Sequence, residues 1–368
     1  MEADLNRIRT RAARTPRTPH ARTPQTRNAL TLTDHSPIFY DLILSNAFRA
    51  APVDNTTAFA VERAHRRYGL SQPSADVTLA WSLLAQSQAN YAGFGTGVWD
   101  ETGLAHLPAG ATEFDGDRRT PSAALCMTWA AWAALQRAAE AAAAAGALRE
   151  PQRYDLVNTA REVLAQLSSP MSQNFSDAFG ANPLDASRLA ATGEPYLALL
   201  DDADELLGTD AAFLLGSWLA AARAWGEGGG AAEDCVLHDA SQPVPCADFY
   251  EWNARAQLTT WKPCLEPACD IMFDSYTPTD YAAKHWNGLV KAYYRARAEQ
   301  VLLQALEDAA AGRPLDGAAV AARKAALAFA FQRDFGNGFP SQPVGDAVEV
   351  SGRLRAKYEP FFAGCGAG

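Results

Sequence analysis

Four carboxylates lie within one short segment, at Asp201, Asp202, Asp204 and Glu205. Carboxylate oxygens are ligands for hard metal ions, so such a group could form a metal site. The neighbouring leucines have helical spacing, however, and on a helix these four side chains point in different directions. We therefore interpret the group as a solvated helix face, and the sequence predicts neither a metal site nor a cofactor.

Asp155 could act as a catalytic acid if it is considered alone. A helix is expected to begin near Pro151, which places Asp155 in its first turn and Arg161 further along. A carboxylate in the first turn complements the helix dipole and can pair with a nearby arginine. The sequence therefore predicts a structural role for Asp155.

Two short-range cysteine pairs stand in loop-like sequence, Cys235 with Cys246 and Cys264 with Cys269. Neither pair has the spacing of a zinc site, and His238 is the only histidine nearby. We therefore favour two disulfides, formed in an oxidising compartment, over four free thiols in a cytosolic protein.

The chain has 368 residues and a formal net charge of -10. An acidic protein repels nucleic acid and anionic membrane surfaces, so neither is an expected partner. No apolar run is long enough to span a bilayer, and the first residues lack the apolar core of a secretory signal. The sequons at Asn55 and Asn174 are candidate glycosylation sites, which agree with a secretory location.

The composition favours helices. Alanine is abundant, β-branched residues are sparse, and no stretch of useful length alternates apolar and polar residues. Residues 1–36 differ, because Arg-Thr-Pro tripeptides repeat there and the prolines exclude helix and strand alike. We expect a disordered basic arm over these residues, followed by an all-α fold, a multi-helix bundle of antiparallel neighbours.

Aromatic side chains gather between Tyr250 and Arg297, where two helical patterns flank an insert that contains proline and cysteine. The rings of this stretch belong to Trp252, Trp261, Tyr281, His285, Trp286, Tyr293 and Tyr294. The polar residues that could accompany them are Asn253, Arg255, Gln257, Thr259, Asp280 and Lys284. Most of the unusual side chains of the chain collect in this stretch.

The order of these residues resembles the signature of the C-terminal domain of α-N-acetylglucosaminidases. These glycoside hydrolases remove terminal α-linked N-acetylglucosamine. The matching positions are Tyr250, Asn253, Arg255, Gln257, Leu258, Thr259, Trp261, Asp280, Tyr281, Ala282, Lys284, Gly288, Leu289, Tyr293 and Tyr294. Further segments that resemble the family are Arg66–Gly69, Arg153–Arg161, Phe213–Leu219 and Pro340–Asp346.

The resemblance runs from about Pro37 to Phe362 and implies a domain organisation. Residues 37–90 resemble the end of the family's catalytic barrel and its junction, and residues 91–368 resemble the helical C-terminal domain. A (β/α)8 barrel needs about 250 residues, more than the arm before Pro37 provides.

Retaining glycosidases need two carboxylates about 5 Å apart. In the family both are glutamates on barrel strands, and neither has a counterpart here, because no glutamate occurs between Glu2 and Glu62. The resemblance therefore implies no catalytic residue in this chain, and we expect no glycoside hydrolysis by the chain alone.

The resemblance implies that the helical domain forms a wall of the substrate cleft. Trp261 is the first candidate to stack on a sugar, followed by Gln257, Asp280 and Tyr281. The alternative is structural, because Trp252, Trp286, Leu289 and Tyr293 fit helical core spacing and Asp280 could begin a helix.

Two functions follow from the sequence. The first is a truncated homologue whose parent enzyme hydrolyses terminal α-linked N-acetylglucosamine of glycans such as heparan sulfate. Its partners would be that glycan and either a separate barrel domain or further copies of the chain, in the lysosome or outside the cell. The second is a non-catalytic helical module that binds carbohydrate or protein.

Overall fold

The computed structural model describes residues 53, 55–90, 120–227, 235–237, 243–261, 284–336 and 338–366. These residues form ten α-helices and no β-strand, which confirms the all-α prediction. The helices are α4 Thr56–Arg67, α5 Ala75–Asn90, α6 Ala123–Ala144, α7 Glu150–Ala178, α8 Ala186–Leu207, α9 Leu215–Glu227, α10 Cys246–Leu258, α11 Ala296–Ala310, α12 Gly317–Arg333 and α13 Ala347–Tyr358. The expected basic arm and residues 37–52 lie outside the described residues.

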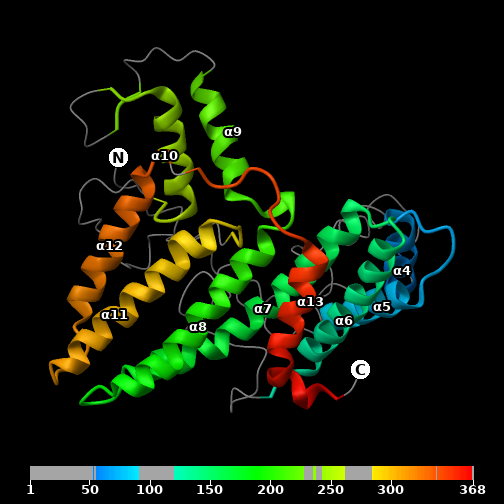
Figure 1. Ribbon diagram of the computed structural model, residues 1–368, viewed down its shortest axis with the longest axis horizontal. Coiled ribbons are helices and arrows are strands. Elements are labelled where there is room, and N and C mark those ends of the chain that lie inside the picture. Colours follow the sequence, from blue (N-terminus) through cyan, green and yellow to red (C-terminus); the bar gives the residue numbers. More distant parts are fainter. Residues whose placement is uncertain are drawn as a thin grey trace, which may run out of the picture.

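The long helices α7 and α8 form the centre of the bundle (Figure 1). Helices α4, α5 and α6 pack at one end, and α13 crosses over α6, α7 and α8. Helices α9 to α12 lie at the other end, where α9 packs beside α10 and α11 contacts both α8 and α12. The candidate site therefore lies at the end opposite α4 and α5.

Short polar side chains begin several helices. The Oδ1 atom of Asp185 accepts hydrogen bonds from the backbone N–H groups of Ser187 and Arg188 at the start of α8. Asp316 and Asp346 do the same at α12 and α13. These N-caps satisfy amide groups that would otherwise lack a partner, so the sequence itself sets where these helices begin.

One hydrophobic core runs through the bundle, with members from Phe59 in α4 to Phe362 near the C-terminal end. Its largest fully buried aromatic side chains include Trp81, Trp132 and Tyr196. The indole of Trp132 also donates a 2.8 Å hydrogen bond to Ser351 of α13, so its polar atom is satisfied inside the core.

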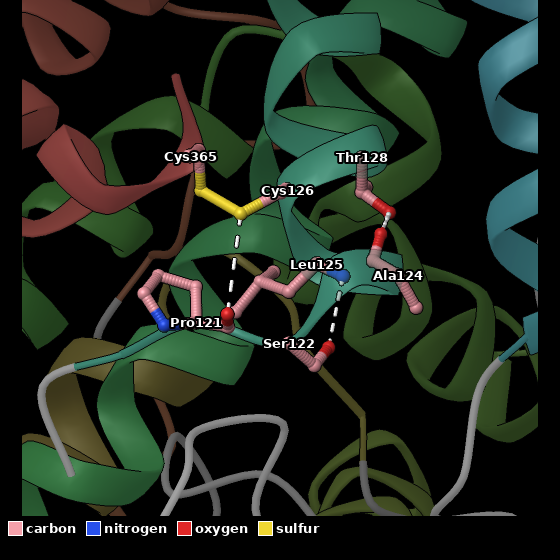
Figure 2. Close-up of a disulfide and its surroundings, with 7 residues drawn as sticks. All are labelled: Pro121, Ser122, Ala124, Leu125, Cys126, Thr128 and Cys365. Atoms are coloured by element: carbon pink, nitrogen blue, oxygen red, sulfur yellow. Dashed lines mark hydrogen bonds between the residues drawn. A yellow bond between two sulfur atoms is a disulfide. The ribbon is translucent and has the colours of Figure 1, made fainter. Parts of the chain in front are cut away.

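The chain is closed on itself by a disulfide between Cys126 at the start of α6 and Cys365 (Figure 2). Near this disulfide, the ring of Phe362 stacks on that of Trp129, with 4.2 Å between the ring centroids. A second disulfide joins Cys235 to Cys246, as the sequence predicts, whereas the predicted pair Cys264 and Cys269 lies outside the described residues. The Cys126–Cys365 disulfide was not predicted.

Two glycines let α9 approach its neighbours closely. A Cβ atom on Gly226 would lie 2.3 Å from the backbone nitrogen of Ala247 in α10. A Cβ atom on Gly216 would lie 2.3 Å from the carbonyl oxygens of Phe339 and Pro340. Both distances are far below van der Waals contact, so only glycine fits at these two crossings. Among the described helices, none is long and apolar enough to cross a membrane.

Candidate functional site

Helix α10 separates the signature residues onto two faces. Trp252, Arg255 and Leu258 are buried against the bundle. Asn253 and Gln257 stand four positions apart on the exposed face. The signature therefore contains residues that packing explains and others that packing does not explain.

Trp261 follows the end of α10 in an unusual backbone conformation. Its φ angle is 58°, and it is the one non-glycine residue with a positive φ among the described residues. Its N–H donates a 2.8 Å hydrogen bond to the carbonyl of Ala256, and its side chain is 47% exposed. A bulky residue in the left-handed region is uncommon, and such strain clusters at binding sites.

Arg255 fastens α10 to the end of α12. Its guanidinium is fully buried and donates to Glu251 at 2.6 and 2.8 Å. It also donates at 3.1 Å to the carbonyls of Phe331 and Asp334, and the rings of Phe331 and Phe339 lie about it at 5.0 and 5.2 Å. A buried arginine is tolerated only when its donors are paired, as they are here.

The hydroxyl groups of Thr259 and Thr260 connect the end of α10 to α12 as well. Gln332 donates from Nε2 to the hydroxyl of Thr260 at 2.6 Å and to that of Thr259 at 3.2 Å. All three residues are buried. The segment that leads into Trp261 is therefore held from a residue more than seventy positions away in the chain.

The second part of the signature is described by the structure from Lys284 onward. Asn287 forms a bridge with the segment before α9: its N–H donates to the carbonyl of Phe213 at 2.7 Å, and its carbonyl accepts from the N–H of Leu215 at 3.1 Å. A π-helix, Val290–Arg295, follows and leads directly into α11. Trp286, beside the bridge, contacts the half-exposed ring of Trp218 at 5.8 Å between centroids.

Asp204 of α8 holds the start of this π-helix. Its carboxylate accepts hydrogen bonds from the N–H groups of Gly288 and Lys291 at 2.7 and 3.0 Å, and from the amide of Asn287 at 2.8 Å. Burial raises the pKa of this carboxyl from 3.8 to about 6, although the two backbone N–H donors oppose the shift.

The interpretation of the four acids as a solvated face is wrong for Asp202 and Asp204, which are buried. Asp202 accepts from the hydroxyl of Tyr358 at 2.5 Å and pairs with Lys357. Asp201 and Glu205 pair with Arg295 and Arg353 on the surface. Each of the four acids has its own set of partners, and the described residues contain no cluster suited to a metal ion.

Asp155 also has a structural place, with partners other than Arg161. Its Oδ2 accepts from the hydroxyl of Tyr68 at 2.8 Å and from Arg67 at 3.3 Å. Burial raises the pKa of the Asp155 carboxyl to about 6, and the charge of Arg67 opposes the shift. Arg161 instead forms a 2.8 Å hydrogen bond with Nδ1 of His285. Arg161 is the donor of this bond, because a guanidinium has no acceptor atom.

Two of the four predicted sugar-contacting residues, Gln257 and Trp261, lie together at the exposed end of α10. Asp280 and Tyr281 lie outside the described residues. Of the candidate glycosylation sites, Asn174 is exposed on α7. Asn55 is exposed too, and its side chain accepts from the N–H of Ala58 as the N-cap of α4.

Sequence reasoning missed Gln332 and Asp204 as supports of this site. Gln332 stands in no segment that was matched to the family pattern, and Asp204 was interpreted as one acid of a solvated face. Both act on residues far away in the chain. The only signal available was their type, a polar residue at a helical position with apolar neighbours. That signal does not reveal a partner.

The sequence of this chain matches a known protein family and a curated relative. The family described as "Alpha-N-acetylglucosaminidase (NAGLU) C-terminal domain" matches residues 60–357. The Homo sapiens protein named "Alpha-N-acetylglucosaminidase" is 32% identical over 330 residues, which are 88% of this chain and 38% of the human protein. The chain thus spans well under half the length of this curated relative.

Solved structures share the fold. A family 89 glycoside hydrolase from Clostridium perfringens, in complex with its substrate GlcNAc-alpha-1,4-galactose, matches with a TM-score of 0.65 and 17% identity, over 87% of this chain and 33% of that one. The same kind of enzyme in complex with 2-acetamido-1,2-dideoxynojirmycin matches with a TM-score of 0.66 and 16% identity, over 88% and 34%.

Proposed function

Because the chain belongs to the family of the alpha-N-acetylglucosaminidase C-terminal domain, we propose that it forms one wall of the substrate cleft of such an enzyme. Its ligand is a terminal α-linked N-acetylglucosamine on a glycan such as heparan sulfate. Trp261 stacks on the sugar, and Gln257, Asp280 and Tyr281 contact its polar groups. The observation that carries the proposal is the exposed ring of Trp261 on a strained backbone.

The exposure and the backbone conformation of Trp261 are both unfavourable for folding. An aromatic ring that leaves 47% of its surface in water loses much of the free energy that burial would supply. A left-handed backbone at a tryptophan costs about 1–3 kcal/mol in addition. A ring held in this way at the end of a helix presents a flat apolar face, which suits the C–H groups on one side of a pyranose.

The reaction itself is assigned to residues outside this chain. We propose that a barrel carrying two glutamates completes the active site, either in a longer polypeptide or as a separate chain. In that arrangement residues 37–90 form the junction with the barrel and residues 91–368 the helical domain. The chain alone then binds sugar weakly and hydrolyses nothing. Assembly into a homo-oligomer is a further route to a complete cleft.

The secretory pathway, leading to the lysosome or the outside of the cell, is the location proposed for this chain. Two disulfides among the described cysteines support it, because disulfides persist in oxidising compartments. Glycosylation at Asn174 and Asn55 would follow from that location, and both side chains are exposed.

A second candidate function is a non-catalytic module that binds carbohydrate or protein. Helix α9 supports it, because Trp218 and Trp225 are 41% and 77% exposed and stand two helical turns apart. Tryptophan is enriched at protein interfaces, and exposed apolar surface can mark a binding site.

The test uses the purified chain with a chromogenic α-N-acetylglucosaminide and, in the same sample, N-acetylglucosamine titrated against tryptophan fluorescence. We expect no turnover and a fluorescence change that Trp261→Ala abolishes. The matched control is Trp225→Ala, which removes an equally large exposed ring from α9 and should leave the change intact. Turnover, or binding that survives Trp261→Ala, would refute the proposed role; loss of binding in Trp225→Ala alone would favour the second candidate.

A further inference from the structure

We propose that Gln332 of α12 is a positioning residue of this sugar site, which it serves by fixing the hydroxyl groups of Thr259 and Thr260 and through them the ring of Trp261. The inference rests on the proposed function, because it assumes that the exposed face of Trp261 meets the sugar. It adds a residue that touches no ligand and comes from another helix.

The backbone at Trp261 needs support from its surroundings. The left-handed conformation persists only where neighbouring groups hold it in place, because it is unfavourable by itself for a bulky residue. One hydrogen bond, from the Trp261 N–H to Ala256, is local to α10. The half-exposed side chain has lost much of the packing that fixes a core tryptophan. The two residues before Trp261, Thr259 and Thr260, therefore contribute to the position of its backbone through their hydrogen bonds to Gln332.

The hydrogen bonds of those two residues have consistent donors and acceptors. Thr259 donates its own proton to the carbonyl of Arg255 at 2.8 Å, so its oxygen is available to accept from Gln332. The oxygen of Thr260 accepts from the same Nε2 atom at 2.6 Å. One amide group thus spans both threonines at once, and it does so from a side chain with no exposure to water.

Gln332 is itself held firmly, on both sides. The carbonyl of Phe331 accepts from Arg255 at 3.1 Å, and so does the carbonyl of Asp334. Arg255 belongs to α10, so the two helix ends are fastened around Gln332 by a charged group. The pairing of α10 with α12 therefore resists a small displacement of the Gln332 amide. The hydrogen bonds from this amide in turn fix the hydroxyl groups of Thr259 and Thr260.

The experiment labels the full chain with 5-fluorotryptophan and follows the fluorine resonances by NMR. The resonance of Trp261 is identified by its disappearance in Trp261→Phe. In Gln332→Leu, which keeps a similar volume but removes the donor, we expect this resonance to shift or broaden. We also expect at least a fivefold weaker affinity for N-acetylglucosamine, measured by tryptophan fluorescence.

Gln304→Leu is the matched control. Gln304 is also a buried glutamine, and it donates to Asp308 on α11, away from α10. This variant should lose stability but leave the Trp261 resonance and the affinity unchanged. A second pair keeps the test decisive if Gln332→Leu folds poorly: Thr260→Val should reproduce its effects, and Thr260→Ser should restore both readouts.

An unchanged Trp261 resonance in Gln332→Leu and Thr260→Val would overturn the inference. So would equal losses of affinity in the Gln304 control. If the unmodified chain binds no N-acetylglucosamine, the proposed function is wrong, and Gln332 has no sugar site to position. The Trp261 resonance then shows only whether Gln332 fixes the position of the ring.

Discussion

The Cys126–Cys365 disulfide should stabilise the fold far more than the Cys235–Cys246 disulfide. A cross-link stabilises chiefly by reducing the freedom of the unfolded chain, and the effect grows with the logarithm of the loop that it closes. The first disulfide closes a loop of 239 residues and the second a loop of 11. The perturbation is the removal of each pair by double substitution with alanine, which leaves no unpaired thiol behind.

The loop lengths give the size of the effect. With the loop-entropy relation, the 239-residue loop corresponds to about 5 kcal/mol at 25 °C and the 11-residue loop to about 3 kcal/mol. The variant without Cys126 and Cys365 also loosens the stack of Phe362 on Trp129. We therefore expect it to lose at least about 2 kcal/mol more than the other variant.

Urea unfolding followed by circular dichroism measures both losses. The slope of the transition should also rise in the variant without Cys126 and Cys365, because its unfolded chain exposes more surface. The other double variant serves as the control for the substitution of a cystine by two alanines. Equal losses in the two variants, or a larger loss on removal of Cys235 and Cys246, would refute the loop-entropy reasoning.

Two further predictions concern buried carboxyls and a helix crossing. The folded-state pKa values of Asp155 and Asp204 are about 6, above the unfolded value of about 3.9; their contribution to stability is therefore complete below about pH 4 and lost as the pH rises through about 6. In Asp155→Asn, the free energy of unfolding should change with pH by about 3 kcal/mol less than in the unchanged protein. Urea unfolding at a series of pH values measures this, and the same pH dependence in both proteins would contradict the raised pKa of Asp155. Gly226→Ala should destabilise by about 1–3 kcal/mol despite its better helix propensity, because the new methyl group meets the backbone of α10. Gly317→Ala, in open space at the start of α12, should not destabilise, and similar melting temperatures for the two variants would argue against the close crossing.

Much of the fold could be predicted, because helix signals are local. Alanine-rich apolar spacing and the motif at Arg153 indicated α6 and α7, and Asp316 and Asp346 cap helices where the pattern begins. The π-helix that runs into α11 at Ala296 was not predicted. Its wider turn is stabilised by Asp204, which no local pattern reveals.

The site was predictable only in part, for a related reason. The type and loop position of Trp261 pointed to an exposed ring, but its left-handed backbone and the hydrogen bond from Gln332 of α12 to the preceding Thr260 leave no local pattern. Asp202 was taken for a surface acid because its partner Tyr358 lies 156 positions away. The pairing of Cys126 with Cys365 was missed in the same way, since adjacent cysteines are the natural first choice and a distant partner leaves no local trace.

The long disulfide also places a condition on how the protein is made. Cys126 leaves the ribosome 239 residues ahead of Cys365, which at ordinary synthesis rates is a wait on the order of tens of seconds. Four other cysteines, Cys235, Cys246, Cys264 and Cys269, emerge during that interval. Any bond that Cys126 makes with one of them has to be exchanged before the C-terminal segment can dock. Wherever such a bond forms, biosynthesis of this fold depends on thiol exchange as well as on oxidation.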